Sequence, residues 1–215
     1  MATFDPRALR VYVVTSGTLV SGRGHREIAA AAIEGGATAI QLRAPELDDP
    51  ALLPLARELA SRCRESGVLF IVNDRVDVAM AAGADGAHVG QDDEPEAARA
   101  TLGRGRVLGI SVRDAEQARA AAAAGADYLG VTVWSTATKP EAVGEGLEGV
   151  AAVAASTPLP VVGIGGIDLS NAGLVVRAGA AGVAVISAVA AAEDPDAAVR
   201  ELRAVVDRSM GRDDV

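Results

Sequence analysis

Polar side chains follow two apolar stretches of the chain, and their types could hold a cation beside a phosphate. The apolar run 70–72 leads into Asn73 and Asp74, and the apolar run 87–90 leads toward Asp93. Carboxylate and amide oxygens suit Mg²⁺, which neutralises a pyrophosphate. These residues predict a phosphate-handling enzyme with Asp74 and Asp93 as Mg²⁺ ligands. Each carboxylate by itself could instead cap the helix that follows it.

Cationic side chains elsewhere in the chain could bind the same anion. Arg43 offers a planar fork of donors to phosphate oxygens, and Lys139 offers a compact positive charge. Together with Asn73 and the two carboxylates, they would form a pyrophosphate site in which substrate oxygens complete the coordination of Mg²⁺.

The elements that would position these residues alternate regularly. Short β-branched runs alternate with Ala-rich amphipathic stretches, and helices are expected, for example, at 50–66, 95–102, 114–124 and 168–178. This pattern predicts the α/β class and a single domain over residues 1–215, folded as a (β/α)8 TIM barrel. The eight strands are expected at 10–15, 39–43, 69–73, 86–90, 107–111, 128–133, 161–165 and 182–186.

Glycines at the ends of helices support this count of strands. Gly36, Gly83, Gly125 and Gly179 are each followed by Ala and precede the second, fourth, sixth and eighth expected strands. Glycine at a helix C-terminus supplies the left-handed turn that reverses the chain. The alternative fold is an open doubly wound sheet, which usually has a Gly-rich turn after its first strand. Residues 13–17 lack that turn.

A second phosphate site is indicated by the last two strand ends. In a (β/α)8 barrel the active site lies at the carboxyl ends of the strands, and the loops after strands 7 and 8 often bind phosphate. Gly165 and Gly166 lie at the end of the seventh expected strand, and Ile186 and Ser187 lie at the end of the eighth. Glycines let backbone amides approach phosphate oxygens. A tight turn is the plainer interpretation of the glycine pair.

A long polar loop follows the sixth expected strand. The loop 135–146 carries Thr136, Thr138 and Lys139, and its glycines could hinge a lid. A surface excursion without function is the alternative.

Composition excludes several classes of partner. The net charge of -9 argues against binding to nucleic acid, whereas local cations still allow small phosphorylated substrates. We see no secretory signal, and the most apolar run, 178–192, is too short to cross a membrane. We therefore expect a cytoplasmic protein with no membrane partner. The sequence is also compatible with a homo-oligomer.

The thiol and imidazole side chains give little sign of nucleophilic catalysis. Cys63 is the single cysteine and lies in an expected helix, so no internal disulfide can form and a passive thiol is expected. His88 is expected to be a packed, hydrogen-bonded residue within its strand. His25 is expected to be solvent-exposed at a helix start. No Ser-His-Asp or Cys-His set is apparent.

These residues, in this order, resemble the thiamine-phosphate synthase family over almost the whole chain. The most specific segments are Gln41-Leu42-Arg43, 70–75, His88-Val89-Gly90-Gln91 with Asp93, Thr136-Ala137-Thr138-Lys139, 162–167 and 185–188. The resemblance implies a transferase that joins hydroxymethylpyrimidine pyrophosphate to thiazole phosphate and releases pyrophosphate. The implied mechanism is dissociative and Mg²⁺-assisted.

The resemblance also implies a role for each matched position. Asp74 and Asp93 would be the Mg²⁺ ligands. The catalytic residues would be Arg43, Ser111 and Lys139. The pyrimidine pyrophosphate would be bound by Gln41, Arg43, Asn73, Ser111 and Lys139. The thiazole phosphate would be bound by Thr136, Thr138, Gly166, Ile186 and Ser187.

The chain departs from the family pattern at three places. Pro45 stands where the family has a lysine, Arg113 stands where it has a histidine, and the loop before Ser135 is shortened. We hypothesise that Arg113 partly replaces the charge missing at Pro45. The rival functions are a related thiazole tautomerase, which is an isomerase, and a non-catalytic relative that binds a phosphate ligand.

Overall fold

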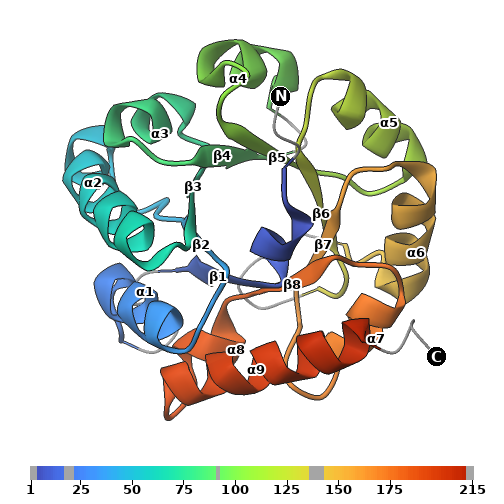
Figure 1. Cartoon of the computed structure of the whole chain (residues 1–215). Coiled ribbons are helices and arrows are strands. Elements are labelled where there is room, and N and C mark those ends of the chain that lie inside the picture. Colours follow the sequence, from blue (N-terminus) through green and yellow to red (C-terminus); the bar gives the residue numbers. More distant parts are fainter. Residues whose placement is uncertain (1–3, 17–21, 91–92, 136–142, 212–215) are drawn as a thin grey trace.

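The chain forms a closed barrel of eight parallel strands. The computed structural model describes residues 4–16, 22–90, 93–135 and 143–211. The strands pair in chain order, and β8 closes the barrel against β1 (Figure 1). This confirms the predicted (β/α)8 fold, and each strand lies within one residue of its expected bounds. The strands are β1 (Val11–Thr15), β2 (Ala39–Leu42), β3 (Leu69–Asn73), β4 (Gly86–Val89), β5 (Val107–Ser111), β6 (Tyr128–Thr132), β7 (Val161–Ile164) and β8 (Gly182–Val185).

Helices surround the barrel on its outer side (Figure 1). A short 3-10 helix, η1 (Pro6–Leu9), precedes β1. The others are α1 (His25–Glu34), α2 (Asp49–Ser66), α3 (Val76–Ala82), α4 (Pro95–Leu102), α5 (Ala115–Ala123), α6 (Gly146–Ser156), α7 (Ala172–Arg177), α8 (Ser187–Ala190) and α9 (Pro195–Met210). Within the described ranges, no helix combines the length and apolar character needed to cross a membrane.

One expected helix is shorter than its sequence pattern indicated. The stretch 168–178 contains only α7, because the residues before it form a hydrogen-bonded turn. Asp168 Oδ1 accepts hydrogen bonds from the amide and the hydroxyl of Ser170 at 2.8 and 2.6 Å, and Asn171 Oδ1 accepts from the Asp168 amide at 2.9 Å. Short polar side chains that bond to nearby backbone compete with helix formation in this way.

The turns from helix to strand confirm the expected role of the repeated glycines. The φ angles of Gly36, Gly83, Gly125 and Gly179 are 83°, 70°, 90° and 105°. These values lie where residues with a Cβ atom are disfavoured. In each case the amide of the following Ala donates a hydrogen bond to the carbonyl five residues earlier, which ends the helix.

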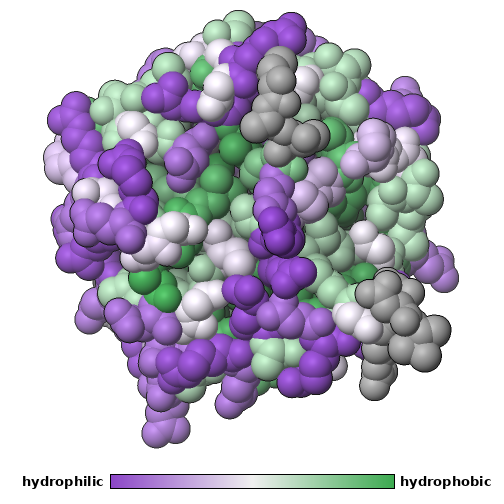
Figure 2. Space-filling view, in the orientation of Figure 1, coloured by the Kyte–Doolittle hydropathy of each residue, from purple (hydrophilic) through white to green (hydrophobic). Residues whose placement is uncertain are grey.

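Side chains fasten the amino end of the barrel. The residue immediately before each of β2, β4 and β6 accepts a hydrogen bond from an amide of the strand that precedes it in the chain. These residues are Thr38, Asp85 and Asp127, and the bonds to the amides of β1, β3 and β5 are 2.8–2.9 Å long. η1 lies at the centre of the barrel in the view of Figure 1, and its Leu9 is fully buried. Figure 2 shows hydrophilic residues over the centre of this face. A functional site is therefore expected at the carboxyl end of the barrel.

The core has two parts, one between the strands and the helices and one inside the barrel. The inner cluster includes Leu9, Tyr12, Val14, Ile71 and Tyr128. Cys63 lies in the outer cluster, and burial raises the pKa of its thiol to about 12. The passive-thiol prediction agrees with this environment, because the thiolate is the reactive form.

Candidate active site

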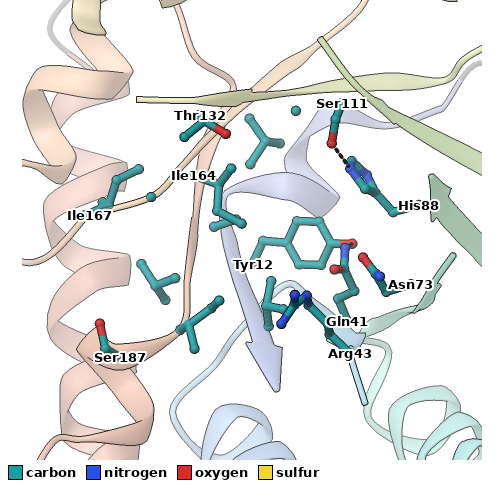
Figure 3. Close-up of a pocket in the computed structure, with 18 of the residues that line it drawn as sticks. Tyr12, Gln41, Arg43, Asn73, His88, Ser111, Thr132, Ile164, Ile167 and Ser187 are labelled. Atoms are coloured by element: carbon teal, nitrogen blue, oxygen red, sulfur yellow. Dashed lines mark hydrogen bonds between the residues drawn. The ribbon is translucent and has the colours of Figure 1, made fainter. Parts of the chain in front are cut away.

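One pocket opens at the carboxyl ends of the strands, and all eight strands or the residues after them contribute to its lining. Seven of the residues predicted to bind substrate line it: Gln41, Arg43, Asn73, Ser111, Gly166, Ile186 and Ser187. Figure 3 shows the polar side chains of Gln41, Arg43, Asn73 and Ser111 on one side. Ile164 and Ile167 lie on the other side, with Ser187 below them in the view. The pocket therefore has a polar side and an apolar side.

A chain of hydrogen bonds crosses the polar side. Gln41 Nε2 donates to the Tyr12 hydroxyl at 2.8 Å, and the hydroxyls of Tyr12 and Tyr128 are 2.9 Å apart. The Tyr128 hydroxyl lies 3.0 Å from His88 Nδ1. The His88 Nε2 atom lies 3.0 Å from Ser111 Oγ. The prediction that His88 is packed and hydrogen-bonded is confirmed, although His88 also lines the pocket.

Both tyrosine rings are buried inside the barrel. The exposed fractions are 1% for Tyr12 and 0% for Tyr128. Burial raises the pKa of Tyr12 well above its ordinary value, although the hydrogen bonds that join its hydroxyl to Tyr128 and Gln41 act in the opposite direction. Burial also raises the pKa of Tyr128, and the neighbouring Tyr12 adds to this shift. Both hydroxyls therefore remain protonated at neutral pH.

Two strand glycines make room for this hydrogen-bonded chain. A Cβ atom at Gly109 in β5 would overlap both the Tyr128 ring and His88 Nδ1. A Cβ atom at Gly130 in β6 would lie 3.1 Å from the His88 ring. Glycine inside a strand often marks such a close approach.

The end of β3 presents Asn73 and Asp74. Asp74 has a φ of 60°, and it is the sole non-glycine residue with positive φ in the part of the chain that the structure describes. This conformation costs energy and often accompanies a functional site. Arg75, not Asp74, occupies the N-cap position of α3, so the alternative interpretation of Asp74 as a cap is wrong.

The carboxylate of Asp93 lies just beyond the end of β4. Its Oδ2 atom accepts a hydrogen bond from the Gly90 amide at 2.6 Å, and the N-cap of α4 is Glu94. The interpretation of Asp93 as the cap of α4 is therefore also wrong. Asp74 and Asp93 are both exposed, and they follow neighbouring strands. No group of three or more candidate metal ligands occurs among the described residues.

The end of β2 is held by a histidine that sequence analysis misjudged. His25 is 8% exposed, which contradicts the expected solvent exposure. One ring nitrogen lies 2.7 Å from Thr15 Oγ1, and the other lies 2.8 Å from Glu46 Oε1. Partial burial is the largest single effect on Glu46 and raises its pKa, but the hydrogen bond from His25, a backbone hydrogen bond and the charges of His25 and Arg43 together lower the net pKa. These contacts tie α1 to the ends of β1 and β2, beside Arg43.

The glycines after β7 form an open turn. Gly165 and Gly166 have φ angles of 92° and 64°. Their amides donate no hydrogen bond to any residue within the described ranges. Asn171 Nδ2 donates to the Gly166 carbonyl at 2.9 Å, which holds the turn. The turn lines the pocket, and its two amides are available as donors within the described residues.

Several residues that the sequence analysis singled out are not among those that line the described pocket. Thr136, Thr138 and Lys139 lie outside the described residues, as does most of the expected lid loop. Arg113 is described, but it is exposed and is not among the residues that line the pocket. Pro45 is exposed as well.

Sequence reasoning missed several residues that line the pocket, including both tyrosines. Tyr12, Tyr128, Thr132, Ile164 and Ile167 line the pocket but were not predicted as site residues. A signal was present for the first two, because they are the only tyrosines in a chain with 2% aromatic residues. Both lie in strands, where alternate side chains point into the barrel.

Comparison with known proteins agrees with this geometry. The profile of the thiamine monophosphate synthase family matches residues 11–189. The thiamine-phosphate synthase of Chloroflexus aurantiacus is 49% identical over 199 residues, which cover 92% of each chain. That of Moorella thermoacetica is 48% identical over 205 residues, which cover 94% of this chain and 98% of the relative.

Solved structures show the same fold. Thiamine phosphate pyrophosphorylase from Pyrococcus furiosus matches with a TM-score of 0.89 and 39% identity, covering 96% of this chain and 99% of that one. A 3-hexulose-6-phosphate synthase matches with a TM-score of 0.70 and 21% identity, which shows the shared barrel alone. The length of the match and the identity across it show that this chain belongs to the thiamine monophosphate synthase family and is an enzyme of the transferase class.

Proposed function

We propose that this enzyme joins hydroxymethylpyrimidine pyrophosphate to thiazole phosphate, giving thiamine phosphate and pyrophosphate with the assistance of Mg²⁺. The observation that carries the proposal is one pocket lined by Gln41, Arg43, Asn73 and Ser111 on its polar side and by Ile164 and Ile167 on the other, with Gly166 also in its lining. The relatives named above are called thiamine-phosphate synthases, which supports the same reaction.

The polar side suits the pyrimidine pyrophosphate. Arg43 is half-buried at the end of β2, where its guanidinium can bind phosphate oxygens bidentately. Asn73 would add amide contacts, and Lys139 would add a second cation. Gln41 and Ser111 would hold the pyrimidine ring. This assignment explains why the polar groups of the pocket gather on one side.

The carboxylates of Asp74 and Asp93 fit a Mg²⁺ ion. Both are exposed oxygen donors after neighbouring strands, and Mg²⁺ is often bound by one or two carboxylates together with substrate phosphates. One oxygen of Asp93 is already bonded to the Gly90 amide, so its other oxygen would be the ligand. When bound, the ion would neutralise the charge that develops on the leaving pyrophosphate.

The chemical step needs no protein nucleophile. The bond between the pyrimidine methylene carbon and the pyrophosphate oxygen breaks, and its electron pair leaves with the pyrophosphate. Arg43 and Lys139 would stabilise that charge, which is usually the largest contribution to such catalysis. The lone pair of the thiazole nitrogen then forms the new carbon–nitrogen bond. Ser111 would orient the ring through this step.

The opposite side suits the thiazole phosphate. The amides of Gly165 and Gly166 have no acceptor among the described residues, and Ser187 is exposed at the start of α8. These groups can donate to a phosphate from the loops after β7 and β8, a recurrent arrangement in this fold. Thr136 and Thr138 would complete the site.

The test is a direct assay of thiamine phosphate from both substrates, with Mg²⁺ and with excess chelator. We expect product with Mg²⁺ only. Asp74→Asn should lower kcat/KM by about 100-fold, because two or three kcal/mol of charge stabilisation is lost. Asp77→Asn, an exposed carboxylate in the first turn of α3, is the matched control and should change little.

Other outcomes would replace the proposal. Absence of product under both conditions would contradict it. Conversion of the thiazole phosphate alone, without the pyrimidine substrate, would favour the tautomerase. Binding of both phosphorylated compounds without turnover would favour a non-catalytic relative.

A further inference from the structure

The hydrogen-bonded chain on the polar side of the pocket has a defined direction. We propose that Tyr12, Tyr128 and His88 are positioning residues: they form a relay that fixes which atoms Gln41 and Ser111 present to the substrate ring. The identity of that ring rests on the proposed function, whereas the relay itself is a property of the free protein.

The direction follows from counting protons, beginning at Gln41. The Nε2 atom of Gln41 can only donate, so the Tyr12 oxygen is the acceptor of the 2.8 Å bond. Tyr12 remains protonated in its buried site and has one proton to place. Within the described part of the chain, the Tyr128 oxygen is the one further partner of the Tyr12 hydroxyl. Tyr12 therefore donates to Tyr128.

The same argument continues to Ser111. Tyr128 accepts from Tyr12, so its own proton goes to His88 Nδ1, 3.0 Å away. A nitrogen that accepts carries no proton, and the neutral ring then holds its proton on Nε2. Nε2 donates to Ser111 Oγ at 3.0 Å. The reverse direction would leave the buried Tyr12 proton without an acceptor, which is costly.

Each end of the relay then offers one type of atom to the pocket. Ser111 accepts from His88, so its hydroxyl proton is free to be donated. Gln41 turns its amide nitrogen to Tyr12, and its carbonyl oxygen has no partner among the described residues. That oxygen is not among the buried polar atoms that lack a partner, so it is accessible from the pocket.

The free acceptor at Gln41 and the free donor at Ser111 select a class of ligand. An acceptor at Gln41 and a donor at Ser111 suit a heteroaromatic ring that carries an amino group and a ring nitrogen, as an aminopyrimidine does. A ring with the opposite arrangement would leave buried polar groups unpaired. Gly109 and Gly130 leave the space that the relay requires, so the arrangement is built into β5 and β6.

The first arm of the test needs no substrate. The chain has only two histidines, so their ring nitrogens can be resolved by ¹⁵N NMR, with His25→Gln as the assignment variant. We expect the neutral His88 ring to carry its proton on Nε2. In Tyr128→Phe, which removes only the hydroxyl, the proton should distribute between both nitrogens. A proton on Nδ1 in the unmodified protein, or an unchanged pattern in Tyr128→Phe, would overturn the relay.

The second arm measures each substrate separately. Tyr128→Phe should raise KM for the pyrimidine pyrophosphate about fivefold to tenfold, the loss of one well-placed neutral hydrogen bond, while KM for the thiazole phosphate stays constant. Thr38→Val removes a hydroxyl from the opposite end of the barrel and is the matched control. An equal rise in both KM values would indicate general distortion and would contradict a positioning role.

The two proposals can fail separately. If the unmodified enzyme makes no thiamine phosphate, the proposed function fails, and the NMR arm still decides the relay. If it makes thiamine phosphate but His88 carries its proton on Nδ1, the relay is wrong and the proposed function stands.

Discussion

At the scale of single residues, neighbouring side chains decide what each polar group can do. His25 and His88 are both histidines near strand ends, yet His25 joins Thr15 to Glu46 beside the pocket, whereas His88 lies within the pocket wall. Asp74, just past the end of β3, is unusual in its backbone conformation, because its φ is 60°. The type of residue is therefore a weaker guide than the atoms that it contacts.

Arg113 stands where the family has a histidine, and its hypothesised role is to replace the cation that is missing at Pro45. It stands two positions after the end of β5, and its guanidinium forms no ion pair with another residue in the described ranges. If it partly replaces the cation missing at Pro45, Arg113→Ala should raise KM for the pyrimidine pyrophosphate about threefold to tenfold, as expected for a solvent-exposed charge. Steady-state kinetics at low ionic strength measure this effect.

The matched control for Arg113 is Arg119→Ala. Arg119 is an exposed residue of α5, and its removal changes the net charge by the same amount. Equal KM values for the two variants would show that Arg113 does not replace the missing cation.

At the scale of elements, the strands contribute space as well as side chains. β5 ends in Ser111 and carries Gly109 two positions earlier on the same face. The glycine leaves room for the Tyr128 ring, which reaches across from β6. The geometry of the site thus depends on a residue that has no side chain.

Gly109→Ala tests this use of space. The added methyl group would overlap the Tyr128 ring and His88 Nδ1, so the rings must shift. We expect the free energy of unfolding to fall by about 1–3 kcal/mol, as for other overpacked cores, and KM for the pyrimidine pyrophosphate to rise. Gly105→Ala is the control, because a Cβ atom there meets nothing within 4 Å. Similar urea denaturation midpoints for the two variants would contradict the prediction.

At the scale of the whole molecule, the two ends of the barrel have separate tasks. The amino end is fastened by side chains that accept from strand amides, including Asp85 and Asp127. The carboxyl end carries the polar strand ends and the pocket. Stability and chemistry are therefore expected to respond to different substitutions, as is typical of this fold.

Asp85→Ala tests that separation. It leaves the amide of the buried Phe70 without its 2.8 Å acceptor. The free energy of unfolding should fall by about 1–2 kcal/mol, the cost of an unpaired amide. The value of kcat/KM should stay within twofold, because the pocket lies at the other end. Chemical denaturation measures the change in stability, and steady-state assays on the same preparation measure the change in activity. A large loss of activity in the folded variant would contradict the prediction that the two ends of the barrel act separately.

The sequence by itself determined the barrel and which strand ends line the pocket. Apolar runs alternating with helical stretches specify eight strands, and in a closed parallel barrel all carboxyl strand ends meet at one edge. Residues at those ends, such as Gln41, Asn73 and Ser111, can therefore be grouped without coordinates. Helix ends were also readable, because glycine in a left-handed turn has a local cause.

Tertiary structure alone decided the contacts inside that framework. The burial of His25, the positive φ of Asp74 and the relay through Tyr12, Tyr128 and His88 join residues from different strands and helices. Such contacts depend on side-chain direction and on the space left by residues far away in the chain. Periodicity reports which face of a strand is buried, but hydrogen-bond partners across a barrel are set only when the barrel closes.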